Sequence, residues 1–242
     1  MNQLVITLIY SGAFLLLFAI GEMIFHVLKF KAEHSRKIVH IFTGLICMSF
    51  PFFITTHWSV LFLTLSFVAI LAISIRFNYL NSINGVDRKT SGSYLFPISI
   101  YIMYWAYAYF GHQSITGNDL VWESEISLQG MLSDTAGIFY FLPLLIFSFA
   151  DPAAAIIGKK WPLMPYTVLG QTKTLSGSIG FLTVAFCFSF FYCTHYFTEL
   201  NRAILVAITL AFSTTISEGL AQKGTDNIFV PLIAVITLYL FQ

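Results

Sequence analysis

Charged residues are scarce in this chain. Only 10% of its 242 residues are Asp, Glu, Lys or Arg, 57% are hydrophobic, and the mean hydropathy is +0.81. Soluble domains contain about 25% charged residues, so this composition excludes an ordinary water-soluble fold. A charge inside an apolar segment is costly, so the few charges present indicate where the chemistry is expected.

Cysteine is also scarce, and runs of basic residues are lacking. Cys47, Cys187 and Cys193 are odd in number and lie in apolar segments, which is typical of packing rather than of redox or metal chemistry. A net charge of +1 without a Lys/Arg run or a soluble domain gives no indication of nucleic-acid binding. Internal repeats and low-complexity linkers are absent, so residues 1–242 are expected to form a single membrane domain.

Long apolar runs, by contrast, are abundant. A membrane-crossing helix needs about 20 apolar residues. Eight segments are candidates: Leu4–Leu28, Ile38–Ile54, Trp58–Ile75, Tyr94–Phe110, Thr135–Ile157, Leu175–Phe197, Ala203–Ser217 and Ile228–Phe241. The predicted fold is an all-α, polytopic membrane bundle of seven or eight helices, with one segment re-entrant in the seven-helix alternative. The first run is too long for a cleaved signal peptide, and no Lys or Arg precedes it.

The basic residues sort to one side of these predicted helices. Eleven of the twelve Lys and Arg residues lie in the loops of one side, and only Arg202 lies opposite. The positive-inside rule places these loops in the cytoplasm, with both termini outside if eight helices cross. The loop after the fourth helix contains Asp119, Glu123, Glu125 and Asp134 without Lys or Arg, which suits the outer side.

Acidic and polar residues occur within the helices, close to their cytoplasmic ends. Glu22 and Asp151 each lie seven residues before a cytoplasmic loop, which is about 10 Å along a helix. His26 follows Glu22 by one turn. Six polar side chains from five helices are expected to meet at this depth: Glu22, His40, Asp151, Glu218, Asp226 and Asn227.

Two interpretations of this polar set are open. A carboxylate in hydrocarbon costs several kcal/mol unless it is paired, protonated or hydrated. Carboxylates around a polar cavity suit Mg²⁺, which prefers oxygen ligands and keeps substrate phosphates beside it. The alternative is mutual neutralisation, with Glu22 pairing with Arg36 and Asp151 pairing with Lys173.

The segment 151–180 has the sequence DPAAAIIGKKWPLMPYTVLGQTKTLSGSIG. Pro152 removes a backbone hydrogen bond and is expected to kink the helix at Asp151. The small residues 153–155 and Gly158 allow another helix or a ligand to approach closely. Pro162, Pro165 and Gly170 are expected to shape a cytoplasmic loop.

The sixth predicted helix begins with Lys173-Thr174 and Ser176-Gly177-Ser178. Free N–H groups, hydroxyl groups and a lysine at a helix N-terminus make an anion site, which predicts phosphate binding. An ordinary capped helix explains the same residues. The GxxxxGK[ST] motif is missing, so a Walker A loop is excluded.

Four blocks of sequence occur in order between residues 33 and 231. They are EHSRKIVH at 33–40 with Gly44 after it, SGSYLFP at 91–97, DPAAAIIGKK at 151–160 with KTLSGS at 173–178, and Glu218 followed by GTDNIFVP at 224–231. Together they resemble the membrane polyprenol kinase family, which comprises phytol kinases, dolichol kinases and CTP-dependent diacylglycerol kinases. Ser176 stands where many members have Glu, and Leu163 stands where a Gly is often found.

The resemblance implies a CTP-dependent kinase that phosphorylates the hydroxyl group of a membrane lipid alcohol, with Mg²⁺, at the cytoplasmic face. The alcohol is of the phytol, polyprenol or dolichol type, or a diacylglycerol. The predicted catalytic residues of the kinase are Asp151, His40 and Lys173, with His40 or Asp151 taking the proton of the lipid hydroxyl group. The predicted nucleotide-binding residues are Arg36, Lys37, Gly158, Lys159, Lys160, Lys173, Thr174, Gly177 and Ser178. The predicted Mg²⁺ ligands are Asp151, Glu218, Asp226 and Asn227.

Two other functions share features with this one. A cytidylyltransferase would join CMP to a lipid phosphate in the same setting. The His-Gly-Gly and Asp-Arg-x-Asp run of phosphatidate cytidylyltransferases is missing, as is the DGxxAR pattern of CDP-alcohol phosphotransferases. A transporter would use the buried charges as a transport path, but no inverted repeat supports it.

Overall fold

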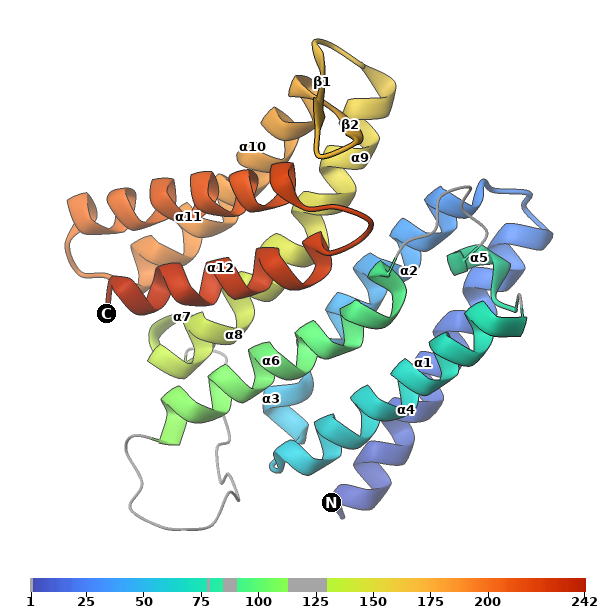
Figure 1. Cartoon of the computed structure of the whole chain (residues 1–242). Coiled ribbons are helices and arrows are strands. Elements are labelled where there is room, and N and C mark those ends of the chain that lie inside the picture. The colour runs from blue at the N-terminus through green and yellow to red at the C-terminus, as the bar shows by residue number, and fades with distance from the viewer. Residues whose placement is uncertain (1, 78, 85–90, 113–129) are drawn as a thin grey trace.

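The structure, a computed structural model, describes residues 2–77, 79–84, 91–112 and 130–242. Helices account for nearly all of it (Figure 1). The elements in chain order are α1 (Gln3–His26), α2 (Ala32–Cys47), α3 (Phe50–Phe53), α4 (His57–Phe77), α5 (Asn81–Asn84), α6 (Gly92–His112), α7 (Gly130–Ser133), α8 (Thr135–Leu145), the π-helical turn η1 (Ile146–Ala150), α9 (Asp151–Lys160), β1 (Pro165–Val168), β2 (Gln171–Thr174), α10 (Leu175–Tyr196), α11 (Leu200–Leu220) and α12 (Asp226–Leu240).

Each of the eight predicted segments is helical, which confirms the all-α polytopic bundle. Six helical segments of the described residues are long and apolar enough to cross a membrane: 3–26, 32–53, 57–77, 135–160, 175–196 and 200–220. Of the other two predicted helices, α6 has 21 residues and α12 has 15. The protein is therefore an integral membrane protein, and the seven- and eight-crossing alternatives both stay predictions.

Helix α2 begins six residues before the predicted start at Ile38. Lys31 is its extended N-cap residue, and Glu33 lies in its first turn, where a negative charge is favoured by the helix dipole. Arg36 and Lys37 therefore lie on the helix rather than in a loop. A hydropathy pattern misses this start because the first turns of α2 are polar.

The helices form two groups that α6 connects (Figure 1). In the first group α1 packs against α2 and α4, and α4 packs against α6. In the second, α10 packs against α9 and α11, α11 against α12, and α6 contacts α8 and α12. The hairpin β1–β2 projects beyond the bundle, beside the C-terminal end of α9 and the N-terminal end of α10.

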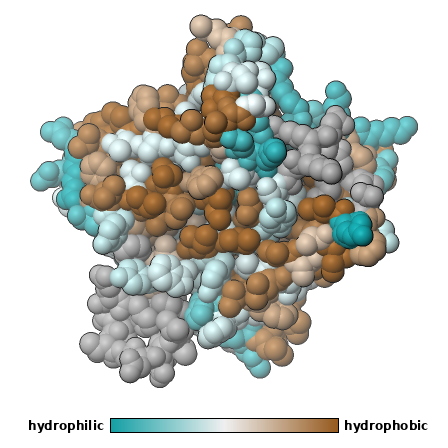
Figure 2. All heavy atoms as spheres, viewed as in Figure 1, coloured by the Kyte–Doolittle hydropathy of each residue, from teal (hydrophilic) through white to brown (hydrophobic). Residues whose placement is uncertain are grey.

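Large apolar side chains are exposed over much of the molecular surface. Figure 2 shows broad patches of hydrophobic residues on the described part of the visible face, with more polar residues between them and at its edges. Leu4, Trp58 and Leu240 expose 67%, 62% and 74% of their surface. A water-soluble protein rarely exposes contiguous apolar patches of this extent. The hydrocarbon chains of a bilayer, by contrast, solvate such patches well.

The chain departs from α-helical geometry just before Asp151, next to Pro152. The π-helical turn η1 separates α8 from α9 there. Because Pro152 has no N–H to donate, the regular α-helical ladder loses a hydrogen bond, and π-turns of this kind often lie at functional sites. The carbonyl oxygen of Phe147, in this turn, is 3.0 Å from Nε2 of His40.

The predicted loop between α9 and α10 contains an antiparallel hairpin, which the sequence interpretation missed. Pro165 pairs with Thr174 and Val168 with Gln171. Leu169 and Gly170 connect the strands with φ values of +50° and +81°, and two successive positive φ values are typical of tight hairpin turns. The hairpin places Lys173 on β2, directly before α10.

The described basic ends of the helices meet at one end of the bundle. Lys159 at the end of α9 pairs with Glu33 at the start of α2, and the N–H of Ser91 donates to the carbonyl of Lys223 at 2.8 Å. Arg202, at the start of α11, donates to the carbonyl of Phe241. Arg88, Lys89, Asp119, Glu123 and Glu125 lie outside the described residues. Which end faces the cytoplasm stays a prediction.

Candidate functional site

A large polar cavity lies at the basic end of the bundle, between α2, α9, β2, α10, α11 and α12. Its volume is about 820 Å³. Thirteen of the fourteen predicted site residues line it: Arg36, Lys37, His40, Asp151, Gly158, Lys159, Lys173, Thr174, Gly177, Ser178, Glu218, Asp226 and Asn227. The structure therefore brings together residues from three of the four sequence blocks, while their individual roles stay predictions.

Lys37 on α2 forms an ion pair with Asp151, the first residue of α9. The two side chains expose only 17% and 12% of their surface. The predicted partner of Asp151 was Lys173, and that pairing is wrong. Because α2 begins at Ala32, Lys37 lies on a helical turn that faces α9, so it neutralises Asp151 instead.

Lys173 on β2 pairs with Glu218 near the end of α11. Its Nζ atom lies 2.7 Å from Oε1 of Glu218 and also donates to the Glu218 carbonyl oxygen. These side chains expose 16% and 10% of their surface. Two hydrogen bonds, to a carboxylate and to a carbonyl oxygen, hold the Lys173 ammonium group in place. Lys173 and Glu218 both line the cavity.

Glu22 and His26 lie apart from the cavity-lining residues, which corrects the prediction that the whole polar set meets. Glu22 accepts a hydrogen bond from the backbone N–H of Ser82 at 2.8 Å, and its other oxygen is 3.0 Å from Nε2 of His26. The proposed pairing of Glu22 with Arg36 is therefore wrong. Helix α5, which the sequence did not reveal, supplies the partner of Glu22.

Arg36 lies instead beside the N-terminal end of α6 and the start of α12. A methyl group added at Gly92 would be 2.5 Å from Nη2 of Arg36 and 2.9 Å from Nδ2 of Asn227. The Asn227 amide donates to the Gly92 carbonyl at 2.6 Å, and the hydroxyl of Ser99 donates to the Asn227 carbonyl. These contacts explain why a small residue stands at the centre of the SGS block.

The start of α10 is a capped helix that also borders the cavity. The Thr174 hydroxyl accepts a hydrogen bond from the Gly177 N–H at 3.2 Å, and the hydroxyls of Ser178 and Tyr166 are 2.7 Å apart. A methyl group at Gly177 would approach the Ala154 carbonyl to 2.9 Å, and one at Gly158 would approach the Thr174 hydroxyl to 2.6 Å. Close packing of α9 against α10 thus accounts for both glycines.

His40 lies on the border of the polar cavity and is buried. A carbonyl oxygen only accepts hydrogen bonds, so Nε2 of His40 carries the proton that it donates to Phe147. Nδ1 is then the nitrogen of the neutral ring that can accept a proton.

The carboxylates of the cavity are separate rather than gathered in a preformed metal centre. No group of three or more His, Cys, Asp or Glu side chains within the described ranges is placed to hold a metal ion. Asp151 and Glu218 each pair with a lysine, whereas Asp226 takes part in none of the ion pairs found among these residues. Oxygen donors of this kind fit Mg²⁺ bound by one or two carboxylates, with substrate phosphates supplying further ligands.

Lys160 is the one predicted site residue that does not line the cavity. Its ammonium group lies 4.5 Å from the ring centroid of Trp161. Conversely, Lys31, Glu33, Gln171 and Thr172 line the cavity and had no predicted role. Glu33 belongs to the first sequence block, so its membership of that block could have identified it as a site residue. Gln171 and Thr172 reach the cavity because they lie on β2 of the hairpin, which the sequence did not reveal.

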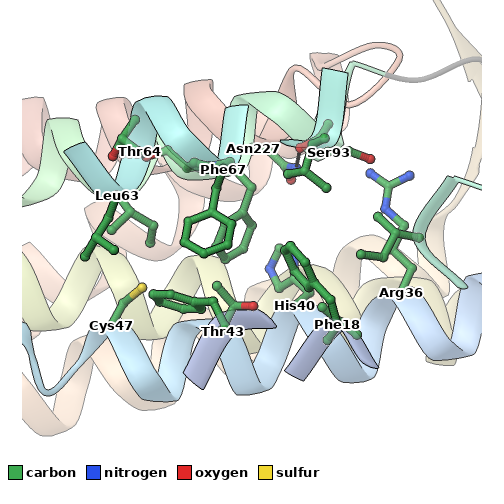
Figure 3. A pocket seen from close by; sticks show the side chains of 18 of the residues that line it. Phe18, Arg36, His40, Thr43, Cys47, Leu63, Thr64, Phe67, Ser93 and Asn227 are labelled. Atoms are coloured by element: carbon green, nitrogen blue, oxygen red, sulfur yellow. Dashed lines mark hydrogen bonds between the residues drawn. The ribbon is translucent and has the colours of Figure 1, made fainter. Parts of the chain in front are cut away.

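A second, narrow cavity lies inside the bundle (Figure 3), and part of its lining is shared with the polar cavity. Arg36, His40 and Asn227 line both cavities. The remaining walls are mainly apolar and come from α1, α2, α4 and α6. Figure 3 shows Arg36 and Asn227 at one end and Cys47 and Leu63 at the other.

Comparison with known proteins gives one informative similarity. No family model matches the chain, and no solved structure matches it. Over 223 residues the chain is 24% identical to a protein from Synechocystis sp. named phytol kinase, and the aligned region covers 92% of this chain and 84% of that protein. This similarity supports the resemblance to the polyprenol kinase family and extends over nearly the whole chain.

Proposed function

We propose that the protein is a membrane lipid-alcohol kinase that transfers the γ-phosphoryl group of CTP to the hydroxyl group of a lipid such as phytol or another polyprenol. The observation that carries this proposal is the polar cavity, because thirteen residues of the family-like blocks converge on it. The sequence similarity to a phytol kinase also supports the proposal. The cavity belongs to a single membrane domain and, by the positive-inside rule, faces the cytoplasm.

In this proposal the basic side chains of the cavity bind the triphosphate. Phosphoryl transfer depends mainly on positioning and on neutralising charge. Lys173 and Lys37 come from opposite walls, β2 and α2, and Arg36 and Lys159 extend the basic lining. Asp226, with Asn227 beside it, and Asp151 or Glu218 would hold Mg²⁺. The metal ion supplies charge neutralisation at the phosphate oxygens when it is bound.

The alcohol oxygen attacks the γ-phosphorus, a new P–O bond forms, and the bond between the γ-phosphorus and the bridging oxygen breaks. CDP leaves with the bonding electrons, and the hydroxyl proton passes to a base. We favour Nδ1 of His40 as the base, because Nε2 is committed to Phe147. Asp151 is the alternative, but its pairing with Lys37 stabilises the charged carboxylate and weakens it as a base.

The test uses purified protein, Mg²⁺ and a panel of lipid alcohols: phytol, geranylgeraniol, dolichol and diacylglycerol. With γ-labelled CTP, we expect label in a lipid monophosphate, and with α-labelled CTP we expect label only in CDP. With a lipid phosphate such as phytyl phosphate or phosphatidate as the acceptor, label in the lipid from α-labelled CTP alone would instead establish a cytidylyltransferase. ATP in place of CTP tests the nucleotide preference, and absence of transfer to every acceptor with either nucleotide would exclude the kinase.

A further inference from the structure

The narrow apolar cavity lies where an amphiphilic acceptor would have to bind. One end is polar and is shared with the cavity that we propose for the nucleotide, through Arg36, His40 and Asn227. The other end is formed by side chains such as Cys47 and Leu63 (Figure 3), which expose 2% and 3% of their surface. A molecule with a hydroxyl group at one end and a hydrocarbon chain at the other matches this change in polarity.

We propose that this cavity binds the first carbons of the acceptor's hydrocarbon chain, with the hydroxyl group at His40, and that Leu63 sets the limit at its far end. The inference rests on the proposed function and deepens it. The enzyme would then recognise the acceptor by its hydroxyl-proximal segment rather than by its full length.

The volume of the cavity limits how many carbon atoms of the acceptor's hydrocarbon chain it can hold. Its volume is about 80 Å³. A cavity of about 150 Å³ binds benzene, which has six carbon atoms, so on the same scale this cavity accommodates on the order of three carbon atoms. This space takes the carbon atoms next to the hydroxyl group, and the rest of a polyprenol must lie outside it.

The physical chemistry of the walls favours this orientation of the ligand. Burial of hydrocarbon against apolar walls is favourable without being directional, so the apolar end alone would accept a chain in either direction. A hydroxyl group there would find fewer hydrogen-bonding partners, since the Thr64 hydroxyl already donates to the carbonyl oxygen of Pro97, and a poorly satisfied hydroxyl group costs free energy. At the opposite end, His40 and the Asn227 side chain, fixed by its 2.6 Å bond to Gly92, provide polar surroundings. The hydroxyl group is therefore directed to the end that is shared with the polar cavity.

Two substitutions on the same helix provide a matched kinetic test. Leu63→Phe enlarges a side chain inside the cavity, and Leu65→Phe makes the same change at a position that exposes 59% of its surface. We expect Leu63→Phe to lower kcat/KM for phytol by about tenfold or more with the KM for CTP unchanged. Leu65→Phe should behave as the native protein. Equal activity of the native protein and a folded Leu63→Phe variant would overturn the inference.

A binding experiment on the unaltered protein avoids any effect of Leu63→Phe on folding and needs no phosphoryl transfer. A polyprenol analogue with a diazirine in its first isoprene unit is cross-linked in the absence of nucleotide, and the labelled residues are mapped by mass spectrometry. We expect labels on the cavity-facing residues of α2 and α4, competed by phytol but not by phytane, which lacks the hydroxyl group. Labels confined to the lipid-facing surface, or labels insensitive to phytol, would refute the inference. A protein that transfers phosphate but labels elsewhere contradicts only this inference, whereas a protein without transfer contradicts the proposed function.

Discussion

At the scale of single residues, the cavity is defined by lysines that already have carboxylate partners. Lys37 pairs with Asp151, and Lys173 pairs with Glu218. Both pairs are largely shielded from solvent, so each charge depends on its partner. A substitution in either pair therefore changes stability as well as the proposed chemistry, and the two effects must be separated by the choice of variants.

Asp151→Asn should abolish phosphoryl transfer and also destabilise the protein, because Lys37 would remain buried without its counter-charge. Breaking a buried pair in this way costs about 3–5 kcal/mol, and the lower end applies here because both side chains retain some exposure. The double variant Lys37→Met/Asp151→Asn removes both charges of the pair together. The thermal unfolding midpoint in detergent should then recover, but activity should not. Substantial activity in either variant would exclude Asp151 from the chemistry.

Lys173→Ala should raise the KM for CTP, because a charged hydrogen bond to phosphate contributes about 1.5–3 kcal/mol, which corresponds to roughly tenfold or more. Lys160→Ala is the matched control, since the Lys160 ammonium group lies over Trp161 and outside the cavity. Steady-state kinetics with varied CTP distinguish the two variants. If both leave the KM for CTP unchanged, Lys173 has only a structural role.

The pairing partners were the part of the site that the sequence could not supply. The motif residues could be found from their order in the chain, and thirteen of them do meet in one cavity. Which lysine meets which carboxylate depends on the rotation of α2 and on the strand that carries Lys173. The partners of Asp151 and Glu22 were wrong for this reason: both depend on elements whose bounds hydropathy does not reveal.

At the scale of elements, the helices could be predicted from long apolar runs. The short polar elements, namely the start of α2 and the hairpin, could not be predicted from hydropathy. Each of the eight runs is helical, although the runs 38–54 and 135–157 each contain more than one helix. The start of α2 was missed because it is charged, and the hairpin was missed because its strands have four residues each and contain few apolar side chains. Both missed features contribute directly to the cavity.

The hairpin turn should control how well Lys173 is placed. Gly170 has a φ value of +81°, which a β-branched residue adopts only with strain. Gly170→Val should therefore distort the hairpin and raise the KM for CTP, with little change in the unfolding midpoint of the helical bundle. Leu169→Asn is the control, because Asn tolerates the positive φ of +50° found there. A Gly170→Val variant with native kinetics would show that the turn does not position Lys173.

At the scale of the whole molecule, the distribution of basic residues predicts the orientation in the membrane. In a background without the three native cysteines, Lys31→Cys and Lys159→Cys should be protected from a membrane-impermeant maleimide on intact cells. Arg202→Cys, at the opposite end of the bundle, should react. Positive-inside sorting is the physical basis of this expectation. Labelling of Lys159→Cys from outside would reverse the orientation and with it the cytoplasmic position of the site.

The paired lysines also determine how the cavity responds to ionic strength. Among the described residues that line it, five are basic and four are acidic, so its formal charge is close to zero. In the proposed function, a nucleotide would then bind by replacing carboxylates as partners of the lysines, and not by entering a region of accumulated positive charge. Long-range attraction, which salt screens over a Debye length of about 8–10 Å at 0.1–0.15 M, contributes little to such an exchange. Affinity for the nucleotide should consequently vary far less with salt concentration than it does for an exposed basic surface.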